Sequence, residues 1–204
     1  MKINVYIDGF NLFYGSLRDS SYRWLNIESL ALKLVRRDQL HRVRYFTAKI
    51  TPRPGHPRAV LHQQVYLRAL ATLPTVSVHF GHFLTTNAVM PSLYPPPTLV
   101  KVIKTEEKGS DVNLATNLLV DAFDGDFEKA IVVSNDSDLC EPIAVMRKKF
   151  NLPVEVINPH PSPSLALKRI ASFQRQLRTW ELASSLLPNT LTDAAGTITK
   201  PTGW

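Results

Sequence analysis

Short apolar strands alternate with amphipathic helices along most of this chain, and this alternation is the feature that most restricts its fold. The runs at 3–7, 129–134 and 154–157 are rich in β-forming residues and almost continuously apolar, which is typical of strands buried on both faces. Over 110–123, apolar residues instead recur at helical spacing. The alternation predicts an α/β fold in which helices cover both faces of a mostly parallel sheet.

The other elements follow from the same periodicities and from the positions of prolines. Further strands are predicted at 41–50 and 75–81, and further helices at 12–18, 27–37, 58–71, 139–150 and from about Ser164. Four prolines within 85–100 indicate an irregular surface insertion, and 98–105 is compatible with an extended edge. After Pro188 the chain is polar and has no period, so we expect one domain over 1–180 and a flexible C-terminal extension over 181–204.

Composition limits the partners and the compartment of the protein. Lys and Arg number 24 against 17 Asp and Glu, and the resulting net charge of +7 favours a polyanionic partner. The single cysteine, Cys140, excludes an internal disulfide and a cysteine-only zinc site, and it fits a reducing cytoplasm. No apolar run reaches membrane-spanning length, and the N-terminus lacks the apolar core of a signal peptide. We therefore expect a soluble, cytoplasmic protein that makes no membrane contact.

Acidic residues stand at the exits of two predicted buried strands. Asp8 follows the first strand in "VYIDGFNLFYG", and Asp136 follows another in "AIVVSNDSDL", with Asp138 two residues later. Asp111 lies in the first turn of the helix predicted over 110–123. If the two strands are neighbours, Asp8 and Asp136 face the same crevice at the carboxyl edge of the sheet. Clustered carboxylates repel unless a cation lies between them, and hard divalent ions prefer oxygen ligands.

Each of these polar residues also has a purely structural interpretation. Asp138, with a glutamate three residues later, has the spacing of a capping box. Asp111 is favoured in a first helical turn by the helix dipole, and Asn11 is a suitable N-cap. Asp8 and Asp136 have no obvious capping role, although either could be a turn acid. Their shared position after buried strands favours a functional site.

Three stretches, "YIDGFNLFYG", "EKGSDVNLATNLL" and "AIVVSNDSDL", together resemble the NYN domain, a branch of the PIN-like nuclease superfamily, and in particular its bacterial LabA-like group. The resemblance covers 1–180 and implies a PIN-like Rossmannoid fold, a three-layer sandwich. It also implies a divalent-metal-dependent ribonuclease that cleaves RNA internally by means of a metal-activated water. Mg²⁺ or Mn²⁺ is the implied cofactor and RNA the implied partner. The oligomeric state stays open, with a homodimer as one option.

The resemblance implies roles for individual residues by matching positions. It gives catalytic roles to Asp8, Asn11, Asp111 and Asp136, metal-binding roles to Asp8, Asp111, Asp136 and Asp138, and supporting roles to Ser134 and Asn135. One departure is Asn117, which occupies a position that is often acidic in the family. The departure supports the alternative that the chain is a catalytically weak or inactive RNA-binding module.

Three basic residues near the predicted site are candidates to contact RNA phosphates. Lys108 stands three residues before Asp111, and Arg53 and Arg58 lie in a proline-rich loop after a predicted strand. Contacts of this kind position a nucleic acid without reading its sequence.

Overall fold

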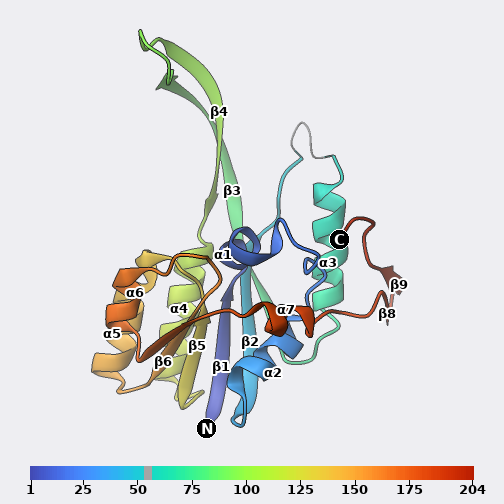
Figure 1. Ribbon diagram of the computed structural model, residues 1–204, viewed down its shortest axis with the longest axis vertical. Coiled ribbons are helices and arrows are strands. Elements are labelled where there is room, and N and C mark those ends of the chain that lie inside the picture. The colour runs from blue at the N-terminus through green and yellow to red at the C-terminus, as the bar shows by residue number, and fades with distance from the viewer. Residues whose placement is uncertain (53–56) are drawn as a thin grey trace.

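The computed structural model describes residues 1–52 and 57–204, and its centre is a seven-stranded sheet with helices on both faces (Figure 1). The strand order is β4-β3-β2-β1-β5-β6-β7, and every pairing is parallel except that of β3 with β4. The strands of this sheet are β1 (Lys2–Asp8), β2 (Gln39–Ala48), β3 (Val76–Pro91), β4 (Leu99–Lys108), β5 (Lys129–Val133), β6 (Val154–Asn158) and β7 (Phe173–Gln176). The predicted three-layer α/β sandwich is therefore confirmed.

Seven α-helices connect and cover the strands in the described residues. They are α1 (Gly9–Leu12), α2 (Ile27–Val35), α3 (Ala59–Leu70), α4 (Ser110–Phe123), α5 (Cys140–Lys149), α6 (Leu165–Ile170) and α7 (Thr179–Ala183). A π-helical turn, Phe13–Leu17, continues α1, and a 3₁₀ turn, Ser137–Leu139, precedes α5. Within the described part of the chain, no helix combines the length and the apolarity that crossing a bilayer requires.

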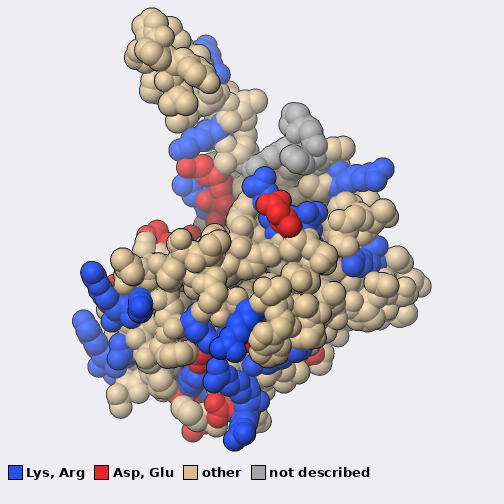
Figure 2. All heavy atoms as spheres, in the orientation of Figure 1, with Lys and Arg blue, Asp and Glu red and all other residues tan. Residues whose placement is uncertain are grey.

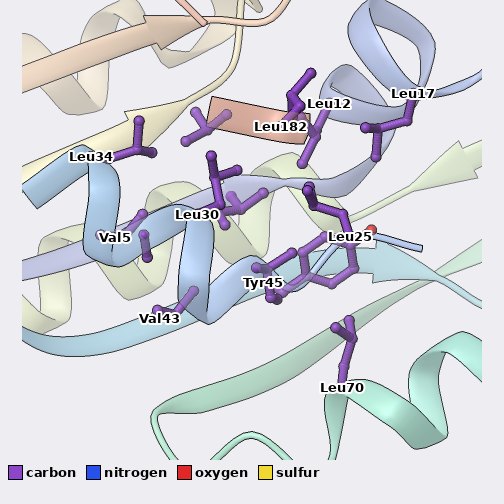
Figure 3. Packing of buried hydrophobic residues seen from close by; sticks show 14 of the residues in the cluster. Val5, Leu12, Leu17, Leu25, Leu30, Leu34, Val43, Tyr45, Leu70 and Leu182 are labelled. Carbon is purple, nitrogen blue, oxygen red and sulfur yellow. The ribbon is translucent and has the colours of Figure 1, made fainter. Parts of the chain in front are cut away.

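Alternating side chains of the central strands separate two hydrophobic cores, because successive residues of a strand point to opposite faces. Figure 3 shows the first core, in which Val5 of β1 and Val43 and Tyr45 of β2 lie with Leu30 and Leu34 of α2. The second core lies on the other face and joins β1 and β5 to α4, α5 and α6. Burial on both faces explains why these strands read as continuous apolar runs.

The central position of β1 determines where the functional candidates lie. The strand pairs in parallel with β2 on one side and with β5 on the other. Ile7 is the register partner of Val133, so β1 and β5 end at the same level of the sheet. The segments that follow these strands consequently leave the sheet side by side.

The predicted irregular insertion at 85–100 is wrong. In the structure β3 and β4 form a long antiparallel hairpin whose register runs from His82 opposite Lys108 to Pro91 opposite Leu99. The prolines caused the misreading, because they usually interrupt a strand. Here Pro91 is the last residue of β3, and the other prolines of the segment lie in the turn, where a missing N–H does not interrupt the ladder.

The C-terminal segment also differs from the expected flexible extension. Residues beyond 188 form an antiparallel hairpin of β8 (Thr190–Asp193) and β9 (Gly196–Thr199). Ile198 of this hairpin is only 2% exposed, and Trp204 packs against Trp24 and Tyr66. The large apolar residues of this mostly polar segment, Leu191, Ile198 and Trp204, thus pack against the first core, a tertiary effect that local composition does not reveal. The structure also shows β7, which follows α6 where we predicted no strand.

Candidate metal site

Three carboxylates converge at the carboxyl edge of the sheet. One oxygen from each of Asp8, Asp111 and Asp136 lies within 4.8 Å of the others. Asp8 is the last residue of β1, Asp136 follows β5, and Asp111 stands in the first turn of α4. The parallel pairing of β1 with β5 brings the first two acids together, and α4 adds the third from the face that it covers.

Asp8 is buried, with 3% of its surface exposed, and its carboxylate is held by several donors. Oδ1 accepts the backbone N–H of Asn11 at 2.9 Å. Oδ2 accepts the Asn11 side-chain amide at 2.8 Å and the Ser134 hydroxyl at 2.9 Å. Burial raises the pKa of Asp8, and the negative charge of Asp136 adds to this, while the hydrogen bonds from Asn11 and Ser134 oppose it. The carboxylate therefore has a fixed orientation.

Asp8 and Asp136 both cap short helices, contrary to our expectation that neither had such a role. Asp8 is the N-cap of α1 through its bond to Asn11, and Asn11 is not the cap itself. Oδ1 of Asp136 accepts the backbone N–H of Asp138 at 3.0 Å at the start of the 3₁₀ turn. The predicted capping box at Asp138 is wrong, because its place is taken by Asp136. Asp138 is exposed and does not belong to the group of three converging oxygens.

The pKa of Asp111 reports the repulsion among the three acids. Partial burial, followed by the negative charges of Asp8 and Asp136, raises its pKa from 3.8 to about 6. Glu107 and Asp138 contribute in the same direction. In the absence of a cation, the site therefore stores like-charge repulsion that a bound cation would relieve.

Two asparagines connect the acids to the surrounding loops. The Asn11 Oδ1 atom accepts the backbone N–H of Asn135 at 3.1 Å. Asn135 in turn donates its side-chain amide to the carbonyl of Ser162 and accepts the N–H of Ser164 at 2.7 Å. The predicted supporting residues Ser134 and Asn135 thus lie beside the acids, Ser134 by direct contact and Asn135 through Asn11.

Sequence reasoning missed Glu107. Its Oε1 atom accepts the backbone N–H of Ser110 at 3.0 Å and so caps the start of α4, and its charge acts on Asp111. The sequence does place Glu107 three residues before the first residue of the predicted helix. We did not consider it because the extended edge predicted at 98–105 ended two residues earlier. Gly109 intervenes with a φ of +90°, a left-handed conformation that favours glycine.

The remaining candidates lie around the site rather than in it. Lys108 is exposed at the end of β4, with Nζ 3.5 Å from a carboxylate oxygen of Glu106. Arg58 is exposed just before α3, and Arg53 lies outside the described residues. Asn117 donates its side-chain amide to the backbone carbonyl of Asn113 at 2.8 Å.

The chemistry of the three-acid group fits a hard divalent cation. All three potential ligand atoms are carboxylate oxygens, which Mg²⁺ and Mn²⁺ prefer over sulfur or imidazole nitrogen. The group differs from the two-histidine, one-carboxylate set of non-haem iron oxygenases. In capping, Oδ1 of Asp8 and Oδ1 of Asp136 each accept one hydrogen bond, and a carboxylate oxygen has two lone pairs, so both residues keep acceptor capacity for a cation.

Comparisons with known proteins give a family, a relative and a solved structure to which this chain is similar. A family model described as the NYN domain matches residues 2–175. A protein of Pseudomonas putida named 6-hydroxy-3-succinoylpyridine 3-monooxygenase HspA is 28% identical over 239 aligned positions, which cover 100% of this chain and 75% of that protein. The crystal structure of a Vibrio parahaemolyticus protein of unknown function has the same fold, with a TM-score of 0.59 and 15% identity over 91% of this chain and 96% of that chain.

Proposed function

The chain belongs to the NYN domain family, a branch of the PIN-like nuclease superfamily, and from this premise we propose that it is a divalent-metal-dependent ribonuclease. The observation that carries the proposal is the convergence of Asp8, Asp111 and Asp136 within 4.8 Å at the carboxyl edge of the sheet. This edge is where open α/β sheets bind their ligands.

In this proposal Asp8, Asp111 and Asp136 hold Mg²⁺ or Mn²⁺, with Asp138 adding negative charge from the rim. A bound divalent cation would activate water near neutral pH and stabilise charge on a phosphodiester. Asn11 and Ser134 keep the Asp8 carboxylate in one orientation through the hydrogen bonds described above.

The basic residues around the site would bind the RNA backbone. Lys108 ends β4 immediately before Gly109 and α4, and in this proposal its ammonium group contacts a phosphate of the bound RNA. Arg58 would contact a phosphate further along the strand, and Arg53, which lies outside the described residues, keeps its predicted role as a phosphate contact. Such contacts supply affinity and register but no base specificity.

One alternative is an RNA-binding module that has lost catalysis, as the asparagine at position 117 suggests. The name of the Pseudomonas putida relative describes oxygenation of a small aromatic molecule instead. Three carboxylates suit phosphodiester hydrolysis by a hard cation better than oxygen activation, so we place hydrolysis first.

Labelled single-stranded RNA incubated with Mn²⁺, with Mg²⁺ or with a chelator tests the proposal. We expect internal cleavage that requires the cation and is lost in the Asp136→Asn variant. Asp19→Asn, which removes an exposed acid outside the three-acid group, is the matched control and should cleave normally. RNA binding without cleavage in all three proteins would favour the inactive module, and cleavage in chelator would contradict the metal mechanism.

A further inference from the structure

The β3–β4 hairpin extends far beyond the rest of the sheet (Figure 1). The pairing of β2 with β3 ends at Gly81, whereas the pairing of β3 with β4 continues from His82 to Pro91. We call the projecting residues 82–108 the arm. Along the arm, the described residues supply two strands and no third.

The arm exposes large apolar side chains, most of them near its tip. Leu93 is 91% exposed, Tyr94 80%, Leu99 75% and Ile103 76%. Residues 89–100 contain no Asp, Glu, Lys or Arg, and Figure 2 shows the tip of the arm as predominantly uncharged. An uncharged apolar tip is poorly suited to a polyanion such as RNA and well suited to another protein surface.

A two-stranded ribbon of this kind is marginal in water, and its unpaired edge is a template for a further strand. We propose that the arm is a dimerisation element, in which the outer edge of β4 pairs antiparallel with the β4 edge of a second copy of this chain. The pairing turns two exposed ribbons into one four-stranded sheet. Because both copies use the same edge, the pairing leaves no free β4 edge and the assembly stops at a dimer.

Symmetry restricts how two copies of β4 can pair. A two-fold axis perpendicular to the ribbon keeps each face of the ribbon on its own side. A residue of one β4 and the residue directly opposite it in the other β4 must then point to the same face of the sheet. Because side chains alternate along a strand, the numbers of two such residues differ by an even amount. Leu99, Lys101, Ile103, Thr105 and Glu107 share one face of β4 and satisfy this condition.

Strand overlap restricts the register, because β4 runs from Leu99 to Lys108 and only an axis at Ile103 or Lys104 pairs nearly its whole length. With Ile103 on the axis, Lys101 lies opposite Thr105 of the second copy, and no two like charges lie directly opposite each other. The most exposed apolar residue within β4 then contacts its own equivalent. With Lys104 on the axis, two lysines would lie directly opposite each other, an arrangement that is destabilising. We therefore place Ile103 on the two-fold axis.

The mass of the protein in solution is the first test. Light scattering after gel filtration should give about twice the 23.0 kDa mass of one chain. Ile103→Lys should reduce the mass to that of one chain while leaving the far-ultraviolet circular dichroism unchanged, because this side chain is exposed in the monomer. Leu165→Lys is the matched control, since Leu165 is 65% exposed on α6, and it should behave as the wild type.

Oxidative cross-linking tests the register, with Cys140→Ala as the background. Ile103→Cys should form a covalent dimer, because opposed Cβ atoms lie about 5 Å apart across an antiparallel pair. Val89→Cys, on the same face but one strand further from the axis, should not, since its equivalent lies more than about 14 Å away. A wild-type monomer at every concentration, or a dimer that survives Ile103→Lys, would overturn the proposal. So would a monomer whose arm sediments with vesicles of anionic phospholipid.

Discussion

The hydroxyl of Ser134 donates a hydrogen bond to Oδ2 of Asp8 at 2.9 Å, across the gap between the ends of two neighbouring parallel strands. The hydroxyl oxygen of Ser134 in turn accepts the backbone N–H of Asp136 at 3.1 Å. One buried hydroxyl thus fixes the distance between two of the three acids. The site is preorganised by this bond and by the bonds from Asn11 to Asp8.

Replacing Ser134 by alanine should weaken metal binding and cleavage by about 10- to 100-fold, the usual cost of removing a group that orients a ligand. The measurement is Mn²⁺ affinity by calorimetry together with the cleavage rate. Ser185→Ala is the matched control, because Ser185 is also fully buried but its hydroxyl has no hydrogen-bond partner among the described residues. Equal effects of the two substitutions would show that only packing is lost.

Asp136→Asn should abolish cleavage yet leave the metal-free protein at least as stable as the wild type. The asparagine side chain can still cap the 3₁₀ turn, and the substitution removes repulsion with Asp8 and Asp111. Mg²⁺ should raise the melting temperature of the wild type by binding the native state, and that of the variant much less. A variant that melts lower, with no metal effect in either protein, would mean that Asp136 serves the turn alone.

The core strands were predictable because burial on both faces leaves a direct sequence signal. Residues 3–7, 129–134 and 154–157 all lie in or at strands of the sheet. The edge expected at 98–105 coincides with most of β4, but the outer part of β3 was missed, because this strand is solvent-exposed there and carries neither a continuous apolar run nor a strict alternation. The short polar strand β7 was missed for the same reason.

The three-acid group was predictable because parallel neighbouring strands end at one edge of the sheet. Two things were not. The capping roles of Asp8 and Asp136 depend on where short helical turns begin, and the sequence placed the first helix three residues too late. The contribution of Glu107 depends on the exact end of β4, which lies three residues beyond the predicted edge.

Deleting residues 189–204 should lower the melting temperature, contrary to the expectation of a flexible extension. The deletion removes Trp204 from Trp24, Tyr66 and His62, and Asp193 from its ion pair with Arg68. Trp204→Ala alone should cost about 2 kcal/mol of unfolding free energy, because a partly buried tryptophan contributes less than a fully buried one.

Urea unfolding of Trp204→Ala measures this cost. Trp180→Ala is the control, because Trp180 is 54% exposed and its loss should change stability by less than about 0.5 kcal/mol. If Trp204→Ala also falls within that range, the C-terminal hairpin contributes little to the fold.

Affinity for RNA should fall as salt rises, since phosphate contacts release counterions. In the inactive Asp136→Asn background, a plot of log affinity against log salt should become less steep by about 0.7 for each phosphate contact removed from a single strand. Lys108→Ala and Arg58→Ala should each show this change. Lys168→Ala, an exposed lysine on α6, should not.

Cleavage should increase as the pH rises through about 6, the pKa of Asp111, because only the ionised carboxylate binds a cation.

Stability without metal should change in the opposite sense. The native pKa lies above the unfolded value near 3.8, so between about 4 and about 6 the native state holds more protons than the unfolded state. This contribution to stability is complete below the unfolded pKa and is lost as the pH rises through the native one. Melts across this range should show the loss in the wild type with chelator, and saturating Mg²⁺ should remove it by favouring the ionised form. Asp111→Asn should reduce both the pH dependence of the metal-free melts and the response to Mg²⁺, and the raised pKa of Asp8 should account for part of the dependence that persists. A metal-free wild type whose stability instead rose from about pH 4 to about pH 6 would contradict the proposed repulsion among the three acids.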